Sequence, residues 1–132
     1  MSNKSKDGGH HNRLRDVWAS GGVTFGAIVT SASVSVVQVM ARSGLDWIII
    51  DMEHGAIDLA AAHAMIATTS GTPLVPFVRV SSDAPWHAKA PLDLGAMGIC
   101  FPMTTSRADA EAAVRAVRYP PAGGPINRPQ NA

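Results

Sequence analysis

Short apolar runs alternate along the chain with longer segments that carry helix signals. The apolar runs cover residues 23–29, 45–50, 74–80 and 97–103. Strand starts placed at residues 23, 47, 74 and 98 lie 24, 27 and 24 residues apart. Each interval fits one strand, one crossover helix and two short loops. The second run, LDWIII, is nearly continuous in apolar character, as in a strand buried on both faces of a parallel sheet. The pattern predicts four consecutive βα units.

Capping residues mark three of the four intervening helices. We expect one helix over residues 59–69, a second from residue 83 to residue 95, and a third from residue 106 to residue 117. The residues that begin or end them are Asp58, Gly71, Pro73, Asp83, Pro85, Gly95, and the capping box of Ser106 and Asp109.

The remaining helix signals are weaker. Residues 33–43 carry four valines, which favour a strand by β-branching, but the crossover rhythm requires a helix there. Pro91 removes one hydrogen bond from the helix that ends near Gly95 and is expected to kink it.

The two ends of the chain differ from the middle. Residues 1–12 are polar and rich in glycine, which predicts a mobile tail in which His10 and His11 are solvated and bind no metal. Residues 120–132 are rich in proline and glycine and leave no room for another buried element. We therefore expect a tail (1–12), one α/β domain (13–119) and an irregular C-terminal segment (120–132).

Composition narrows the function classes. Eleven Lys and Arg against ten Asp and Glu give a net charge of +1, and the basic residues are scattered, which argues against a nucleic-acid or anionic-membrane partner. Residues 17–41 carry no charge, but their many hydroxyls and glycines argue against a membrane span. No secretion signal is recognisable, so a cytoplasmic protein is expected. The single Cys100 lies in an apolar run and is predicted to be a core residue.

The end of the second predicted strand carries the densest cluster of ionisable residues. Asp51, Glu53 and His54 follow the apolar run directly. In parallel α/β folds reactive groups gather at the carboxyl ends of strands, and an imidazole beside a carboxylate is a common form of general base. Alternatively, the two acids cap the following loop and the histidine is merely exposed.

Arg79 ends the third predicted strand and should reach the same rim. It can bind a carboxylate or phosphate through paired hydrogen bonds, or it can form a structural bridge with Asp51 or Glu53. Three other basic residues, His63, His87 and Lys89, fall on predicted helices and are expected to be surface or packing residues.

Five segments, taken in order, resemble the HpcH/HpaI aldolase family. They are GLDWIIIDMEH (44–54), PFVRV (76–80), KAPLDLGA (89–96), FPM (101–103) and VRYPPAG (117–123). The resemblance implies a TIM-type (β/α)₈ barrel, of which this chain holds about four units, a half-barrel. It also implies cleavage of 4-hydroxy-2-oxo acids to pyruvate and an aldehyde, with His54 as base, Asp51 as its assistant, and Arg79 binding the pyruvate-like part. Glu53 belongs to the motif without a step of its own.

The same resemblance implies a divalent metal (Mg, Mn or Co) whose Glu and Asp ligands come from later units. No metal ligand can be assigned within this chain, so we expect a lyase that is incomplete as this chain alone. The expected partners are a small 2-oxo acid and either further copies of the chain, as a homo-oligomer, or a complementing half-barrel. One alternative is a non-catalytic half-barrel that acts as an assembly or interaction module through its open strand edges. A weaker one is a different (β/α) enzyme that acts without metal on a carboxylate or phosphate.

Overall fold

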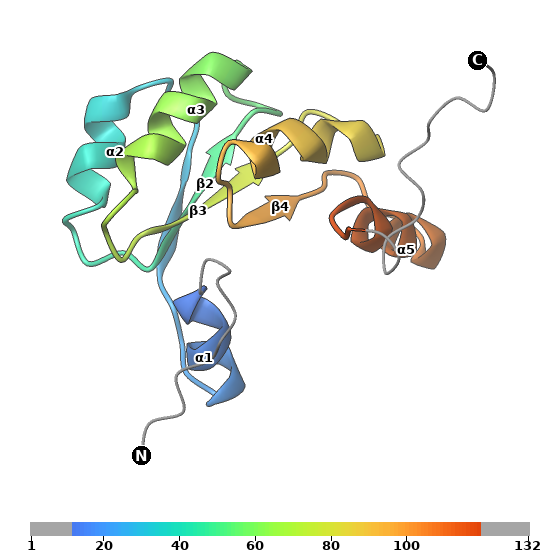
Figure 1. Cartoon of the computed structure of the whole chain (residues 1–132), viewed down its shortest axis with the longest axis horizontal. Coiled ribbons are helices and arrows are strands. Elements are labelled where there is room, and N and C mark those ends of the chain that lie inside the picture. Colours follow the sequence, from blue (N-terminus) through green and yellow to red (C-terminus); the bar gives the residue numbers. More distant parts are fainter. Residues whose placement is uncertain (1–11, 120–132) are drawn as a thin grey trace.

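The predicted alternation of strands and helices is present in the computed structural model, which describes residues 12–119 (Figure 1). In chain order the elements are α1 (Arg13–Ala19), β1 (Gly26–Val29), α2 (Val34–Met40), β2 (Trp47–Asp51), α3 (Leu59–Thr68), β3 (Val75–Arg79), the 3₁₀ helix η1 (Pro85–Ala88), α4 (Lys89–Asp93), β4 (Gly98–Cys100) and α5 (Arg107–Ala116).

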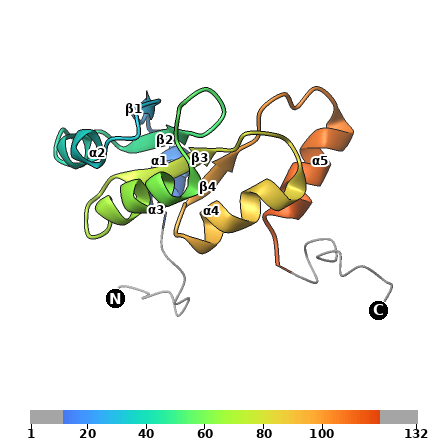
Figure 2. The ribbon, with the colours of Figure 1, turned by 90° about the horizontal axis from the view of Figure 1, so that it is seen from above.

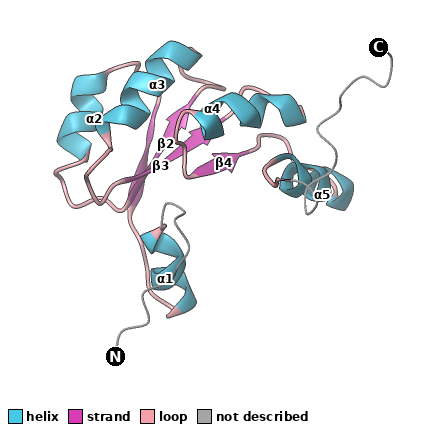
Figure 3. Cartoon of the chain, in the orientation of Figure 1, coloured by secondary structure: helices cyan, strands magenta, loops and turns pink. Residues whose placement is uncertain are grey.

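The four strands form one parallel sheet in the order β1-β2-β3-β4. Each pair of consecutive strands is joined by a helical crossover (Figure 3). The predicted α/β class with four βα units is thus confirmed. This order leaves β1 and β4 as the two edge strands, each with one neighbour among the described residues.

The helices cover one face of the sheet. Alternate strand residues such as Val29, Ile50 and Val78 point to this face and join one core with residues of α2 and α3, among them Val37 and Met65. Figure 2 shows α2, α3 and α4 along this side of the sheet, with α5 beyond β4.

The opposite face of the sheet is not covered by these helices. The register places Trp47, Ile49 and Phe77 on it, with Ile28 of β1 exposed at 54%. All-parallel sheets are normally buried on both faces. This apolar face, called the open face below, is therefore the side on which a complete barrel would have its interior.

Helix ends follow the predicted caps. The Asp58 side chain accepts from the Ala61 N–H at 2.8 Å, and Ser106 and Asp109 form the predicted capping box. Gly71 and Gly95 adopt φ of +73° and +102°, a left-handed conformation that favours glycine directly after a helix.

The structure differs from the prediction in one helix and in the burial of one residue. The helix expected between residues 83 and 95 is divided into η1 and α4, and Pro91 lies buried in the first turn of α4. Cys100 is only half-buried, because β4 is an edge strand with an uncovered face. The valine-rich segment is a helix, as the crossover rhythm requires, and Ser33 caps it.

α1 was not predicted. Asn12, assigned from the sequence to the mobile tail, caps this helix by accepting from the Leu14 N–H at 3.1 Å. Arg13 ties the helix to the amino ends of the strands, donating to the Pro73 carbonyl at 2.9 Å and to Asp46 at 2.5 Å. Leu14 is fully buried.

The predicted terminal segments, residues 1–11 with His10 and His11, and residues 120–132, lie outside the described part of the chain. Within residues 12–119, no helix combines the length and apolar character that crossing a bilayer requires.

Candidate functional site

The last residues of β2 and β3 lie side by side. Asp51 and Arg79 are register partners in the parallel ladder, so their side chains leave the sheet on the same face at its carboxyl edge. The sequence placed both residues at one rim, and the structure brings them into direct contact.

The Arg79 guanidinium binds both oxygens of the Asp51 carboxylate. Its Nε donates to Oδ1 at 2.9 Å and its Nη2 to Oδ2 at 2.5 Å. Such paired bonds fix the plane of the guanidinium as well as its position. The Asp51 side chain is 0% exposed and that of Arg79 is 25% exposed, so the arginine keeps access to solvent on one side.

Asp51 also shapes the turn that follows β2. Its Oδ1 accepts from the backbone N–H of Glu53 at 3.0 Å and of His54 at 3.1 Å. The Arg79 hydrogen bond is the largest cause that lowers the pKa of Asp51 to about 2; burial opposes the shift, and the two backbone donors add to it. The same pairing raises the pKa of Arg79. The carboxylate thus stays ionised while holding both the arginine and the turn.

Glu53 bridges the arginine and the histidine. Its Oε2 lies 3.3 Å from Arg79 Nε and 3.6 Å from His54 Nε2. The strand ends at Asp51, and the turn that follows it returns Glu53 toward Arg79. The sequence named Glu53 as one of two possible bridge partners of Arg79, and the motif gave it no separate catalytic step.

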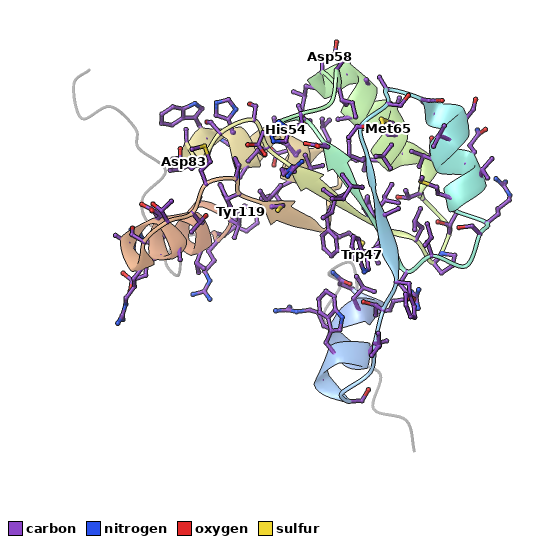
Figure 4. The ribbon with its side chains drawn as sticks, turned by 180° about the vertical axis from the view of Figure 1, so that it is seen from behind. Trp47, His54, Asp58, Met65, Asp83 and Tyr119 are labelled. Atoms are coloured by element: carbon purple, nitrogen blue, oxygen red, sulfur yellow. The ribbon has the colours of Figure 1, made fainter. Side chains whose placement is uncertain are left out.

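His54 lies at the rim with its side chain 69% exposed. Figure 4 shows it at the carboxyl end of the sheet, while Trp47 lies at the other end near α1. Its backbone is fixed by Asp51 and the carboxylate nearest its ring is that of Glu53. An accessible imidazole next to a fixed guanidinium suits a proton transfer close to an anion-binding group.

The cluster does not by itself form a metal site. Both Asp51 oxygens are engaged by Arg79, and the Glu53 oxygen faces a cation. Across residues 12–119 no group of three or more His, Cys, Asp or Glu is arranged to hold a metal ion. The residues present thus do not fit a divalent metal, and we derive no step through one.

The weaker sequence candidates remain on the surface. His63, His87 and Lys89 are exposed, as predicted. His87 Nδ1 lies 3.3 Å from Ser81 Oγ, an exposed contact that lies outside the Asp51–Arg79 cluster.

Comparison with known proteins gives consistent matches. The sequence profile described as HpcH/HpaI aldolase/citrate lyase matches residues 25–129. A hydroxypyruvate/pyruvate aldolase of Roseovarius nubinhibens is 38% identical over 112 residues, which cover 85% of this chain and 44% of that protein. A 4-hydroxy-2-oxo-heptane-1,7-dioate aldolase of Klebsiella pneumoniae is 33% identical, with 86% and 43% covered.

Solved structures show the same relation. An HpcH/HpaI aldolase/citrate lyase family protein from Burkholderia cenocepacia superposes with a TM-score of 0.78 at 32% identity, covering 83% of this chain and 44% of that one. An HpcH/HpaI aldolase from Desulfitobacterium hafniense gives 0.76 at 26% identity, covering 83% and 43%. The chain therefore spans less than half the length of the relatives it matches.

Proposed function

Because the chain belongs to the HpcH/HpaI aldolase/citrate lyase family, we propose that it supplies the base and the arginine of a lyase that splits 4-hydroxy-2-oxo acids into pyruvate and an aldehyde. Its four βα units align with roughly half of the TIM barrels of the family. The rest of the site then comes from residues beyond these units.

The observation that carries the proposal is the contact of four side chains at one rim. Arg79 binds Asp51 and lies near Glu53, which in turn neighbours His54. Aldol cleavage next to a carbonyl needs a base for a hydroxyl proton and a cation for the oxygen that becomes negative. The cluster offers one group for each need.

In this proposal His54 takes the proton from the 4-hydroxyl of the substrate. The C3–C4 bond then breaks, the aldehyde leaves, and the electron pair moves onto the pyruvate part as an enolate, which is protonated at C3 to give pyruvate. Arg79 binds the pyruvate-like part and stabilises the enolate oxygen. Asp51 assists His54 through the backbone of the turn and holds Arg79 in place.

Members of the family depend on a divalent metal, with Mg, Mn or Co expected. No group of metal ligands is found within residues 12–119. The ligands of this metal are therefore proposed to lie outside these residues. A lack of turnover by the chain alone is therefore expected.

The test is complementation. The full chain is mixed with the portion of the Roseovarius nubinhibens aldolase that its alignment leaves unmatched, and pyruvate release from a 4-hydroxy-2-oxo acid is followed with Mg²⁺, Mn²⁺ or Co²⁺ and again in chelator. We expect metal-dependent turnover in the mixture, and a loss of about 10²- to 10⁴-fold in kcat with His54→Ala. His63→Ala, an exposed histidine on α3, is the matched control and should leave the rate unchanged.

A mixture that associates but never releases pyruvate would refute the lyase proposal. It would favour the second candidate, a non-catalytic assembly module. That candidate is supported by the open apolar face and by the Asp51–Arg79 pair, which already satisfies both partners as a structural bridge would.

A further inference from the structure

The two edges of the sheet, formed by β1 and β4, could pair with each other in two copies of the chain. Among residues 12–119, β1 and β4 are the edge strands, and of the helices that follow them α2 contacts α3 and α5 contacts η1. In Figure 1, α2 and α5 lie at opposite ends of the molecule. One end of the molecule therefore exposes the edge of β1 and a side of α2, and the other end exposes the edge of β4 and a side of α5.

Both helices carry exposed apolar residues. On α2, Val36 and Val39 are 38% and 70% exposed, although α2 already contributes the fully buried Val37 to the core. On α5, Val114 is 45% exposed, and Val117, which directly follows the helix, is 39% exposed; none of the residues of α5 is buried. Amphipathic helices normally bury their apolar side against another element, and no element within residues 12–119 fully covers these valines.

A groove lies next to α5. Its volume is about 1200 Å³. Its wall includes Val114 of α5 and the adjacent Val117, Ile99 and Phe101 of the β4 segment, and Leu92 and Leu94 of the α4 segment. This space separates α5 from α4 and β4, so α5 is not packed closely on the sheet.

We propose that two copies of this chain close into an eight-stranded barrel, with β4 of each copy pairing with β1 of the other and α5 of each packing on α2 of the other. This inference goes beyond the proposed lyase and does not need it.

A second copy fits these features better than an unrelated partner. A two-fold rotation about the barrel axis keeps all eight strands parallel and creates two identical junctions, which leaves no edge. It also encloses the open faces with Ile28, Ile49 and Phe77, and an eight-stranded barrel is just wide enough for side chains to fill it.

The open faces carry little charge that would oppose closure. The charged side chains described at the strand ends are already paired, Arg79 with Asp51 and Arg13 with Asp46. The net charge of the whole chain is only +1, so two copies repel each other weakly.

The mass of the full chain in solution tests the proposal. Sedimentation velocity should give twice 13.8 kDa. Val39→Lys on α2 and Val114→Glu on α5 each place a charge in both junctions and should weaken the dimer Kd by about 100-fold or more. Ala64→Glu, on the exposed side of the central helix α3, is the control and should remain dimeric. Circular dichroism checks that every variant is folded, and Val117→Glu replaces Val114→Glu if the latter is not.

Mixing the two variants is the decisive measurement. Val39→Lys and Val114→Glu chains, monomeric alone, should recover the dimer together, because one junction then pairs lysine with glutamate and the other is native. A monomeric wild-type chain, a dimer that neither variant disturbs, a mixture that stays monomeric, or a series of larger assemblies would each overturn the proposal. Because the readout is mass, a failed lyase assay does not affect it.

Discussion

Two arginine–aspartate pairs lie at opposite ends of β2. At the amino end Arg13 of α1 binds Asp46, and at the carboxyl end Arg79 of β3 binds Asp51; each pair has its shortest contact at 2.5 Å. Both link different elements across the sheet. The chemical partners are the same, so any difference between the pairs must come from their surroundings.

The surroundings differ in burial and in the number of bonds. The Arg13 and Asp46 side chains are 41% and 20% exposed, whereas those of Arg79 and Asp51 are 25% and 0% exposed. Asp46 accepts one backbone N–H, from Phe25, while Asp51 accepts two and is bound by two guanidinium nitrogens. A buried carboxylate is stabilised only by its hydrogen-bond donors. Removing one partner of the Asp51–Arg79 pair should therefore cost more stability than removing one partner of the Asp46–Arg13 pair.

The largest effect expected from this comparison is the loss of Asp51. Asp51→Ala leaves Arg79 and two backbone N–H groups without their acceptor and should lower the free energy of unfolding by about 3 kcal/mol. Urea unfolding followed by circular dichroism measures it. Asp46→Ala is the matched control and should cost less than half as much; equal losses would contradict the comparison.

Lowering the pH should also weaken the Asp51–Arg79 pair, with a smaller loss of stability than Asp51→Ala causes. The folded pKa of Asp51 is about 2, below its ordinary value of 3.8, so its contribution is complete above pH 3.8 and is lost as the pH falls through 2. The shift corresponds to about 2 kcal/mol. The free energy of unfolding of the wild type exceeds that of Asp51→Asn by an amount that depends on pH. Measured by urea unfolding, this difference should decrease by about 2 kcal/mol between pH 5 and pH 2. A difference that stays constant over this range would show that the pair is not a stabilising one.

The smallest effect is expected at the amino end. Arg13→Lys keeps the charge but loses the geometry that serves both Asp46 and the Pro73 carbonyl. Because this pair is more exposed than the rim pair, the urea midpoint should move only slightly. Amide hydrogen exchange should accelerate in α1 and remain unchanged in β2. Faster exchange in both elements would mean that α1 supports the whole sheet.

The sequence predicted the fold well where periodicity and caps agreed. The run at residues 45–50 and the caps at Asp58 and Ser106 each led to an observed element. The sequence did not predict α1, because this helix has only seven residues, of which Leu14 alone is buried, and therefore shows no apolar periodicity. Arg13 links this helix to the sheet through partners 33 and 60 residues away, which no local sequence pattern encodes.

At the site, the sequence identified which residues meet but not how they pair. It left open whether Arg79 would bridge to Asp51 or Glu53 or serve a ligand, and the structure shows contacts with both acids. Pairing depends on side-chain geometry across two strands and a turn, which residue order does not determine. The catalytic roles of His54, Asp51 and Arg79 stay predictions until turnover is measured.

The aromatic rings on the open face restrict which mutations the edge strands tolerate. Trp47 lies where a Cβ at Gly26 would be, and Phe77 where a Cβ at Gly98 would be. Even alanine at either glycine would have to displace a neighbouring ring. Mutant libraries of this chain should therefore vary each glycine only together with the ring that packs on it, Gly26 with Trp47 and Gly98 with Phe77.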